Sequence, residues 1–361
     1  MERVFNFSAG PATLPLPVIE QAKADLPVFP GAGASIMEIS HRSKTFLKIL
    51  EQTQADLKSL IGVSDDYHVL FTPGGATQQF TMLAMNFLAG KKADYLHVGS
   101  WASKAMKDAG RFGTTRAAWS GKADNFVRMP GDAELDLDPE AEYVHMTSNE
   151  TIQGIQFAAE PDVKGKPLFC DASSDFLCRP FDPRKYALMY AGAQKNVGPS
   201  GTAVVLLRAD MLERVPANLP PLLDYKVLVE NDSMYNTPST FTIYIIGLVM
   251  KWLRDEIGGL EKMGELNRMK AAMVYDAIDN SGGFYRGHAE KAHRSIMNVT
   301  FRVGNEEQEA MFIDQAKKAG LDGLKGHRSV GGVRASIYNA MPVEGVKALC
   351  DFMAEFQRVN G

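Results

Sequence analysis

Two ionisable residues, Asp171 and Lys195, each follow a short apolar run and stand 24 residues apart. Lys195 lies in AGAQKNVGPSG, where small neighbours leave room for a flat ligand. A lysine whose pKa is lowered by partial desolvation can attack an aldehyde and form a Schiff base. Asp171 ends the run KPLFC, where a carboxylate can keep a pyridinium nitrogen protonated. The separation is that of one helical crossover between strands, so the pair predicts one shared site.

Each member of this pair also has an ordinary structural interpretation. Lys195 could be a solvated surface lysine, which is the usual state of this side chain. Asp171 could cap the N-terminus of a helix with Ser173 and Ser174 nearby. The pair is more specific than either residue alone, and it is the pair that favours a functional site.

A glycine turn, Gly74-Gly75-Ala76-Thr77, joins an apolar run to the predicted helix ATQQFTMLAMNFL. The free N–H groups and positive dipole end of such a helix suit a phosphate group. The turn is neither G-x-G-x-x-G nor G-x-x-x-x-G-K-[ST], and the chain contains neither pattern elsewhere. This argues against an NAD-dependent dehydrogenase or a P-loop protein. A tight turn without a ligand is the alternative.

Further positions offer groups that a flat, phosphorylated ligand would need. Trp101 follows YLHVGS, and its indole could stack on an aromatic ring or simply pack in the core. Thr151 and Gln194 offer hydrogen bonds, with turn positions as their alternative role. Asn236 and Thr237 precede a predicted helix and form a second candidate anion site, although capping of that helix is at least as good an interpretation.

Arginine and histidine recur in two pairs, His41-Arg42 and His327-Arg328, and Arg334 follows the second pair. The rigid fork of arginine binds carboxylate or phosphate through two hydrogen bonds, so this set suggests a substrate that carries both groups. No acidic or histidine partner stands at ligand spacing, which disfavours a metal site. Solvated surface charge is the alternative for each arginine.

The elements that position these residues are expected to alternate between strands and helices from about residue 65 to 208. Such alternation is typical of a parallel sheet with crossover helices, so the predicted fold class is α/β. Ligands bind outside the carboxyl ends of such strands, where the residues named above collect. The expected strands are His68–Phe71, Tyr95–Val98, Tyr143–Met146, Leu168–Cys170, Leu188–Tyr190 and Ala203–Leu207.

A long amphipathic helix is predicted from Pro238 to about Glu256, with Asn236-Thr237 as its cap and Gly258-Gly259 at its end. The domain change is expected there, giving a large domain of residues 1–258 and a smaller α+β domain of residues 259–361. It stays open whether the N-terminal segment, residues 1–15, packs with the small domain. The small domain should contain helices at Glu261–Ile278 and Glu306–Ala319 and strands at Met297–Val303 and Val333–Ile337.

The composition is that of a globular protein with a sizeable core, since 45% of the 361 residues are hydrophobic and 23% are charged. A net charge of -4 gives no overall attraction for nucleic acid or an anionic membrane. The three cysteines, Cys170, Cys178 and Cys350, lack C-x-x-C spacing, which argues against a disulfide framework or structural zinc. We identify no signal peptide or membrane span, so a cytoplasmic location is expected.

Several long segments together give the chain a family resemblance. It resembles the class V, fold-type I family of aminotransferases that depend on pyridoxal phosphate, and within that family the phosphoserine aminotransferases. The resemblance runs nearly end to end and is carried by FNFSAGPATLP at 5–15, SIMEISHRSKTF at 35–46, NETIQGIQF at 149–157, YAGAQKNVGPSG at 190–201, MYNTPSTF at 234–241 and KGHRSVGGVRASIYNAMP at 325–342.

The resemblance implies a cofactor role for each residue singled out above. Lys195 would hold pyridoxal phosphate as a Schiff base, and Asp171 would meet its pyridine nitrogen. Trp101 would stack on the ring, and Thr151 would bind on the side of the phenolic oxygen. The implied phosphate ligands are Gln194, the backbone at Ala76 and Thr77, and Asn236 and Thr237 of the partner chain in a homodimer with shared active sites.

The resemblance also implies the reaction. L-Glutamate would give its amino group to 3-phosphohydroxypyruvate, forming O-phospho-L-serine and 2-oxoglutarate in serine biosynthesis. The 4-phosphohydroxythreonine step of pyridoxine biosynthesis is a second implied reaction. The implied substrate ligands are His41, Arg42, His327 and Arg328 for the phosphate and Arg334 for the α-carboxylate.

The sequence departs from the family pattern at three positions, and two other functions are alternatives. Some family members have Gly and Arg at the positions of Ala76 and Thr77, and Ser at that of Ala9, so one arginine contact is lost here. A cysteine desulfurase is disfavoured because Gln194, not histidine, precedes Lys195. A non-catalytic binder of phosphorylated metabolites remains the rival from another class.

Overall fold

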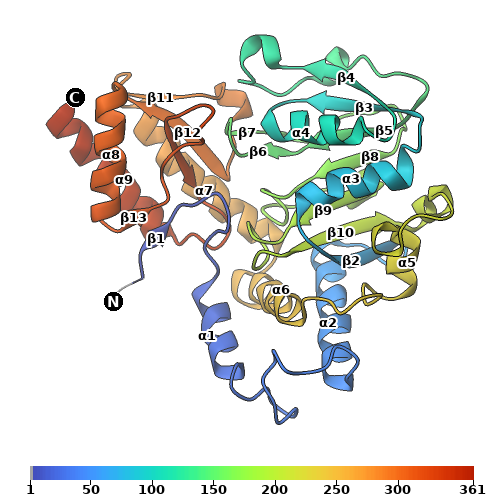
Figure 1. The fold of residues 1–361 in the computed structure, drawn as a ribbon. Helices are drawn as coiled ribbons and strands as arrows, with labels where there is room; N and C mark the ends of the chain where they lie inside the picture. The colour runs from blue at the N-terminus through green and yellow to red at the C-terminus, as the bar shows by residue number, and fades with distance from the viewer. Residues whose placement is uncertain (1–2) are drawn as a thin grey trace.

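A seven-stranded sheet forms the centre of the chain in the computed structural model, which describes residues 3–361 (Figure 1). The strands follow in the order β2 (Tyr67–Pro73), β10 (Thr202–Arg208), β9 (Leu188–Gly192), β8 (Leu168–Asp171), β5 (Ala141–Thr147), β3 (Lys92–His97) and β4 (Thr114–Ser120). Within this sheet β10 runs antiparallel to both neighbours, while the other strands direct their carboxyl ends to one edge. The predicted α/β class with a mainly parallel sheet is confirmed.

Helices cover both faces of this sheet. Successive side chains of a strand point to opposite faces, so each strand contributes to two separate cores. Leu70 of β2 faces a core that it shares with α3 (Ala76–Phe87), α4 (Ser100–Ala109) and α5 (Tyr225–Glu230). Val69 and Phe71 face a second core with α1 (Leu16–Asp25), α2 (Lys44–Ile61) and α6 (Thr240–Trp252). Burial on both faces explains why the strands appear in the sequence as nearly continuous apolar runs.

The chain beyond residue 258 builds a second sheet with its own core. β11 (Tyr285–Gly287), β12 (Asn298–Val303) and β14 (Val333–Ser336) form an antiparallel sheet that packs with α7 (Leu260–Asp279), α8 (Glu306–Lys318) and α9 (Val343–Asn360). β1 (Phe5–Asn6) pairs in parallel with β13 (Leu321–Asp322), and Phe7 is buried in the same core. The start of α7 also packs against the core of the large sheet, and the division of the chain at residue 258 stays a prediction.

The six expected strands of the large sheet are all present, within a few residues of their predicted bounds. The edge strand β4 was not predicted, because its sequence TTRAAWS is partly exposed and has few large apolar residues. In the C-terminal part, the two expected helices and two expected strands are also present. Among residues 3–361, no helix has the combination of length and apolar character that a membrane crossing requires.

The predicted start of the helix at Pro238 is wrong. α6 begins at Thr240 with Ser239 as its N-cap residue, so Asn236 and Thr237 do not cap it. The Asn236 side-chain amide instead donates to the carbonyl oxygen of its own neighbour, Thr237 (3.4 Å). The predicted end is confirmed, since the helix continues through a π-helical turn, Leu253–Ile257, and stops at Gly258, whose φ of 87° lies in the left-handed region.

The expected helical crossover between Asp171 and Lys195 is also wrong. Residues 172–187 form turns and a short 3-10 helix at Pro183–Lys185, although β8 and β9 are parallel neighbours as predicted. Pro180 and Pro183 lack the N–H donor that a helix needs, which explains the irregular path.

A buried lysine organises the turn between β14 and α9. Lys270 on α7 has no exposed surface, and its Nζ donates to the carbonyl oxygens of Ile337 (3.2 Å), Tyr338 (2.8 Å), Asn339 (3.4 Å) and Met341 (3.1 Å). Carbonyl dipoles of this kind replace the water that a buried ammonium group loses. The lysine therefore fixes a backbone segment that no ladder of a sheet or helix would hold.

We expect Lys270→Met to lower the free energy of unfolding by about 2–4 kcal/mol, because several buried carbonyl groups lose their donor. Urea denaturation followed by circular dichroism measures this change. Lys262→Met is the matched control, since Lys262 lies on the same helix, is exposed and pairs with Glu265 at the surface (2.9 Å). Equal stabilities of the two variants would contradict the assigned role of Lys270.

Candidate functional site

The residues with candidate chemistry lie at one edge of the large sheet. Asp171 is the last residue of β8, and Lys195 follows β9 in the turn that leads to β10. Trp101 lies in the first turn of α4, just beyond β3, and Thr151 follows the short strand β6 (Asn149–Glu150), which with β7 (Ile155–Gln156) forms a hairpin beyond β5. This edge is formed by the carboxyl ends of the parallel strands, where open α/β sheets bind ligands.

Asp171 and Lys195 influence each other's protonation. Asp171 is buried, and its Oδ1 accepts hydrogen bonds from Ser173 N (3.0 Å) and Ser173 Oγ (2.6 Å). Burial raises the pKa of Asp171, while the positive charge of Lys195 opposes this shift. Burial lowers the pKa of Lys195, and the carboxylates of Asp171 and Glu150 oppose it. The arrangement provides an amine that loses its proton more readily than usual beside a carboxylate held in a fixed direction.

The segment that follows Asp171 is a turn, so Asp171 does not cap an α-helix as its alternative interpretation required. The two bonds from Ser173 orient the carboxylate and occupy one of its oxygens. Among the hydrogen bonds of residues 3–361, none reaches Oδ2, so this oxygen is free for a ligand proton.

The Trp101 indole lies beside the lysine amine. Lys195 Nζ is 5.5 Å from the centre of the indole ring. The indole Nε1–H donates to Thr151 Oγ1 (2.8 Å), and Thr151 is almost fully buried. The N-terminal segment packs along the stem of the same side chain, because a Cβ on Gly10 would meet Lys195 Cγ at 3.5 Å. A flat ligand attached to Lys195 would therefore find an aromatic face already fixed in direction.

The N-terminus of α3 provides the features of an anion site. Gly75 is its N-cap residue and supplies no side-chain acceptor for the first N–H groups, which leaves them for a ligand. Thr77 Oγ1 accepts a hydrogen bond from Lys104 Nζ (3.1 Å), so a positive charge lies beside this turn. Gln194 Nε2 lies 4.0 Å from the place of a Cβ on Gly75. Gln194 Oε1 is buried without a hydrogen-bond partner among the described residues, as expected where a polar ligand completes the site.

Basic residues of the C-terminal part add positive charge near one another. The charge of half-buried Arg334 on β14 adds to the lowering of the pKa of Lys195. Burial lowers the pKa of His327, and the charges of Arg334 and Arg328 lower it further. These three side chains form a positive cluster that suits an anionic substrate.

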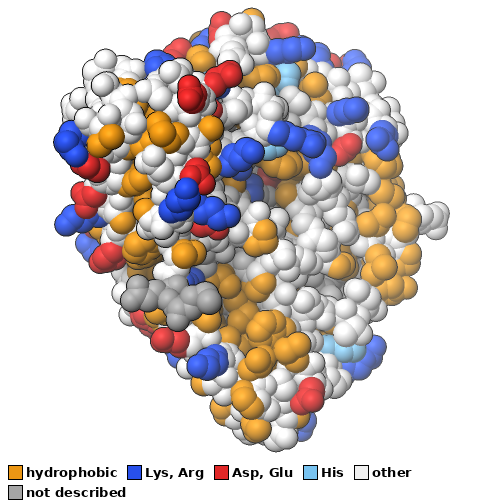
Figure 2. Space-filling model, turned by 60° about the vertical axis from the view of Figure 1, so that its left-hand side comes forward, with side chains coloured by type: hydrophobic (Ala, Val, Ile, Leu, Met, Phe, Trp, Pro, Cys, Tyr) orange, Lys and Arg blue, Asp and Glu red, His pale blue; other side chains and the backbone are white. Residues whose placement is uncertain are grey.

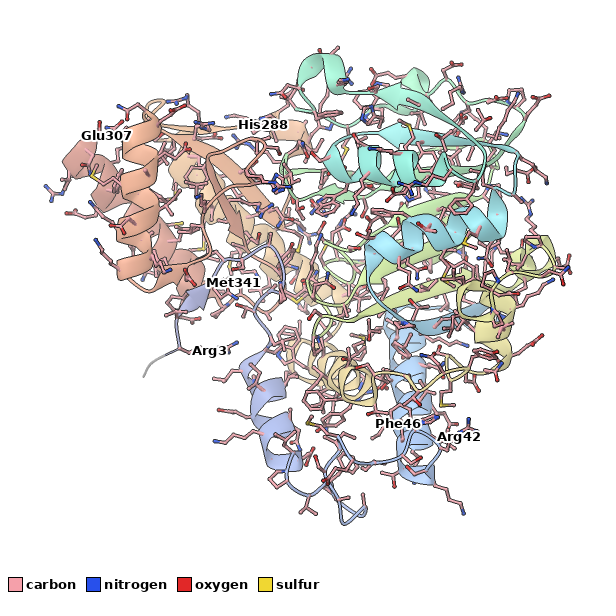
Figure 3. The ribbon with its side chains drawn as sticks, in the orientation of Figure 1. Arg3, Arg42, Phe46, His288, Glu307 and Met341 are labelled. Atoms are coloured by element: carbon pink, nitrogen blue, oxygen red, sulfur yellow. The ribbon has the colours of Figure 1, made fainter. Side chains whose placement is uncertain are left out.

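Other predicted site residues are not brought together within one chain. Figure 3 shows Arg42 near the start of α2, at the opposite end of the molecule from the C-terminal sheet. His41 and Arg42 share no hydrogen bond or ion pair with Lys195 among residues 3–361. Asn236 and Thr237 lie in the segment before α6, and Asn236 Oδ1 is buried with no hydrogen-bond partner among the described residues.

The sequence interpretation missed the roles of three residues near the site. Ser173 orients Asp171, Lys104 bonds Thr77, and Glu150 binds the backbone of Trp101 and Ala102. The only sequence signal was position, since Glu150 directly precedes Thr151 and Ser173 follows Asp171 by two residues.

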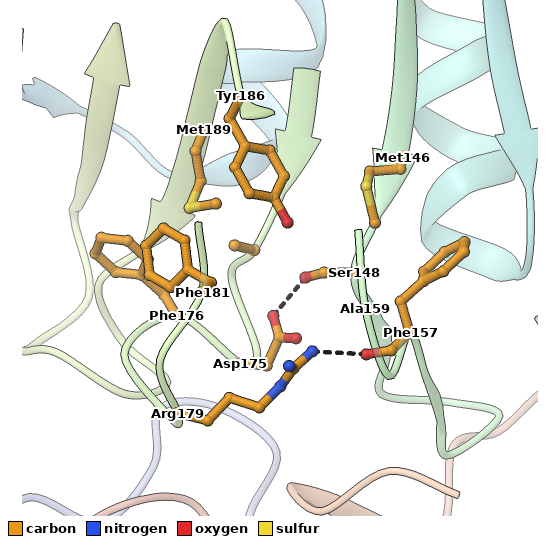
Figure 4. A pocket seen from close by; sticks show the side chains of 11 residues that line it. Met146, Ser148, Phe157, Ala159, Asp175, Phe176, Arg179, Phe181, Tyr186 and Met189 are labelled. Carbon is orange, nitrogen blue, oxygen red and sulfur yellow. Dashed lines mark hydrogen bonds between the residues drawn. The ribbon is translucent and has the colours of Figure 1, made fainter. Parts of the chain in front are cut away.

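A second carboxylate, the partly buried Asp175, lines a small cavity (Figure 4). It accepts hydrogen bonds from Ser148 Oγ and from Gln156 Nε2 (2.9 Å), and Arg179 donates to the carbonyl oxygen of Phe157 (2.7 Å). The cavity of about 30 Å³ has room for about one or two water molecules and none for a substrate. We assign it no part in the chemistry.

The cysteines do not supply a nucleophile at this edge. Cys170 and Cys178 are buried, and burial raises the pKa of both thiols above the usual value. A reactive thiolate needs the opposite shift. This is further evidence against a desulfurase.

The groups at this edge fit the cofactor that the sequence resemblance implied. Pyridoxal phosphate offers an aldehyde, a pyridine nitrogen and a phosphate, and the edge offers an amine, a buried carboxylate with a free oxygen, and an anion site. The indole of Trp101 adds a flat surface beside the amine. The unpartnered Gln194 oxygen marks a polar position that the described residues leave unfilled.

Comparisons with known proteins point the same way. The family model described as "Aminotransferase class-V" matches residues 4–349. A phosphoserine aminotransferase of Desulfosudis oleivorans is 52% identical over 362 residues, covering 100% of this chain and 99% of the relative. The solved phosphoserine aminotransferase of Bacillus circulans subsp. alkalophilus has a TM-score of 0.98 at 50% identity and full coverage of both chains. A pyridoxal-phosphate-bound phosphoserine aminotransferase of Trichomonas vaginalis has a TM-score of 0.92 at 39% identity, covering 98% of this chain and 100% of that one.

Proposed function

Because the chain belongs to the aminotransferase class-V family, we propose that it is a phosphoserine aminotransferase whose chemistry depends on Lys195 and Asp171. It is a transaminase that uses pyridoxal phosphate. The observation that carries the assignment of the residues is the site edge itself, where a desolvated amine, a buried carboxylate and a fixed indole lie together. L-Glutamate is the proposed amino donor and 3-phosphohydroxypyruvate the acceptor, giving phosphoserine and 2-oxoglutarate.

Pyridoxal phosphate supplies an aldehyde for the amine and a protonated ring that draws electrons from the substrate Cα. Asp171 Oδ2 would hold the proton on the ring nitrogen, and Ser173 keeps the carboxylate in place. Trp101 supports the ring, with Thr151 holding the indole. The first N–H groups of α3 and the Gln194 Nε2–H group beside Gly75 would donate to the phosphate.

Lys195 moves the proton during the reaction. Its Nζ would take the proton from the substrate Cα as a base and, as an acid, would deliver it to the cofactor carbon C4′. Desolvation favours the neutral amine that this step requires, because burial lowers the pKa of Lys195. The same amine is the group that would hold pyridoxal phosphate covalently.

Arg334 is the proposed ligand of the substrate α-carboxylate, and His327 and Arg328 are proposed ligands of its phosphate. The charges of Arg334 and Arg328 both lower the pKa of His327, which supports a common positive region formed by these residues. A planar guanidinium binds a carboxylate through two hydrogen bonds, which orients the substrate as well as holding it.

The first experiment compares two substrates by the visible absorption of the bound cofactor. Phosphoserine should convert the spectrum to that of the amine form of the cofactor, whereas unphosphorylated serine should leave it almost unchanged. An equal response to both amino acids would keep the transaminase and reject phosphate recognition. A protein that does not bind pyridoxal phosphate would reject the whole assignment.

A homodimer with shared sites is proposed for the working enzyme. Exposed apolar side chains gather around α1 and the segment after it, where Leu16, Val28 and Met37 are 49%, 58% and 63% exposed. Figure 2 shows apolar side chains over this lower part of the molecule, and such a patch favours a second protein surface. The partnerless Asn236 Oδ1 supports completion of the site by the partner chain.

Mixing two inactive variants tests whether the sites are shared. One chain carries Lys195→Ala and the other carries Asn236→Ala with Thr237→Ala. After unfolding and joint refolding, we expect about a quarter of the wild-type activity, because random pairing makes half of the dimers mixed and each mixed dimer holds one intact site. Recovery no greater than the sum of the separate variants would contradict shared sites.

A cytoplasmic location is also proposed. Two of the three cysteines are buried as free thiols, and the third, Cys350, is partly buried and free, which is the usual state in a reducing compartment.

A further inference from the structure

Glu150 lies buried beside the site and has no role in the chemistry described above. It has no exposed surface, and both of its carboxylate oxygens accept hydrogen bonds from the first turn of α4. Oε2 accepts from Trp101 N (3.1 Å), and Oε1 accepts from Ala102 N (2.8 Å). These backbone groups belong to the residue whose indole faces Lys195 and to its neighbour.

The residues after Glu150 bind the same turn through side chains. The Trp101 indole donates to Thr151 Oγ1 (2.8 Å), and Gln153 Nε2 donates to Ser100 Oγ (2.9 Å). Residues 150–153 therefore hold three consecutive residues of α4, 100–102. Since Glu150 fixes the backbone of Trp101 while Thr151 fixes its ring, the indole is held at two points.

Glycine is required at position 99 because of the neighbouring Glu150 side chain and not because of its own backbone conformation. Gly99 has a φ of 173°, which is extended backbone that any residue adopts. A Cβ at this position would lie 2.4 Å from Glu150 Cδ and 2.6 Å from its Cγ. The missing side chain thus makes room for the carboxylate.

A carboxylate is a costly cap in this place. Burial raises the pKa of Glu150 to about 7, against the effect of its two N–H donors. A serine or threonine at position 99 could cap the helix locally without a buried charge. The carboxylate differs from such a cap because it comes from another segment of the chain, so it fixes α4 relative to the hairpin that carries Thr151.

We propose that Glu150 is a positioning residue, which together with Gly99 fixes the direction of the Trp101 indole against the cofactor beside Lys195. The proposal deepens the proposed function, since it rests on Trp101 as the support of the cofactor ring. Glu150 touches neither substrate nor cofactor in this role. It acts through the backbone of Trp101.

The first test follows the mobility of Trp101 without any cofactor. In a background with Trp119→Phe and Trp252→Phe, Trp101 is the only remaining tryptophan. Glu150→Gln keeps the shape but presents an N–H₂ group to one backbone N–H. We expect the fluorescence anisotropy of Trp101, measured well below the unfolding midpoint, to fall in this variant, because one backbone N–H of the α4 turn loses its acceptor. Unchanged anisotropy would overturn the proposal.

Gly99→Ala provides an independent test that leaves Glu150 in the chain. The added methyl group should displace the carboxylate and lower the anisotropy in the same way. Adding Gly99→Ala to a Glu150→Ala variant should cause no further loss, because the clashing atoms are gone. Gly131→Ala is the matched control, since its φ is -86° and the nearest atom to a Cβ there, Glu134 Oε2, is 3.6 Å away. Additive losses in the double variant would overturn the pairing of Gly99 with Glu150.

The second readout is the affinity for pyridoxal phosphate, measured by titration of the protein freed of cofactor. Glu150→Gln and Gly99→Ala should each weaken it about tenfold, as expected for the loss of a hydrogen bond to a charged group. Failure of the unmodified background to bind pyridoxal phosphate would reject the proposed function, while the anisotropy comparison would still decide the role of Glu150. If the anisotropy of Trp101 fell while the affinity for pyridoxal phosphate stayed unchanged, the proposed link between the position of the indole and cofactor binding would be wrong.

Discussion

Lys195→Ala is expected to lower kcat for amino transfer about 10³- to 10⁴-fold, because the variant lacks both the covalent attachment and the acid–base group. Lys104 Nζ is 5.8 Å from the Trp101 ring centre, but this exposed amine is engaged by Thr77 Oγ1 and is not expected to replace Lys195. The measurement is the rate of 2-oxoglutarate formation from glutamate and 3-phosphohydroxypyruvate at saturating substrate. The absorption spectrum of the protein with pyridoxal phosphate should also lose the signature of the lysine-linked form.

Lys107→Ala is the control for this variant, because Lys107 lies on α4 near the site but is exposed. Its kcat should equal that of the wild type. If Lys195→Ala kept its activity, both the covalent role and the proton transfer assigned to Lys195 would be wrong, and a non-catalytic binder would again become the better hypothesis.

Asp171→Asn is expected to lower kcat about 10²- to 10³-fold while the protein still binds pyridoxal phosphate. The asparagine oxygen can accept the two hydrogen bonds from Ser173, so the side chain keeps its direction. A neutral amide, however, cannot keep the ring nitrogen protonated. Single-turnover measurement of the reaction with phosphoserine isolates the proton-transfer step from product release.

The stability of the same variant provides a check on the electrostatics. Burial raises the pKa of Asp171 above its value in the unfolded chain. Its contribution to stability is therefore fully present below the unfolded pKa and is lost as pH rises through the folded pKa. At neutral pH, Asp171→Asn should leave the unfolding free energy unchanged or raise it. A marked loss of stability together with the loss of kcat would indicate a structural role instead.

Asp175→Asn is the matched control, since Asp175 is also a carboxylate whose pKa is raised by burial. It faces the small cavity behind the sheet edge and bonds Ser148 and Gln156. We expect a much smaller effect on kcat than for Asp171→Asn. Equal effects would mean that the reaction depends on the general field of buried carboxylates and not on the position of Asp171.

Much of the fold could be predicted from local signals. The strands that lead to Asp171 and Lys195 are continuous apolar runs because both faces of the sheet are covered. The edge strand β4 was missed because partial exposure weakens that pattern. The start of α6 was misplaced because Asn236 and Thr237 have the residue types of a cap, while the choice of the cap depends on which side chain meets a free N–H.

The sequence by itself predicted the candidate site, because Lys195, Asp171 and the glycine turn at 74–77 stand where apolar runs end and because short-range patterns record strand ends. Tertiary structure alone decided which side chains cooperate. Segments far apart in the chain meet in three places: β10 pairs antiparallel with β2 and β9, the charge of Arg334 on β14 acts on Lys195, and Glu150 accepts hydrogen bonds from the first turn of α4. Such contacts depend on strand order and packing, which leave no periodic signal in a single sequence.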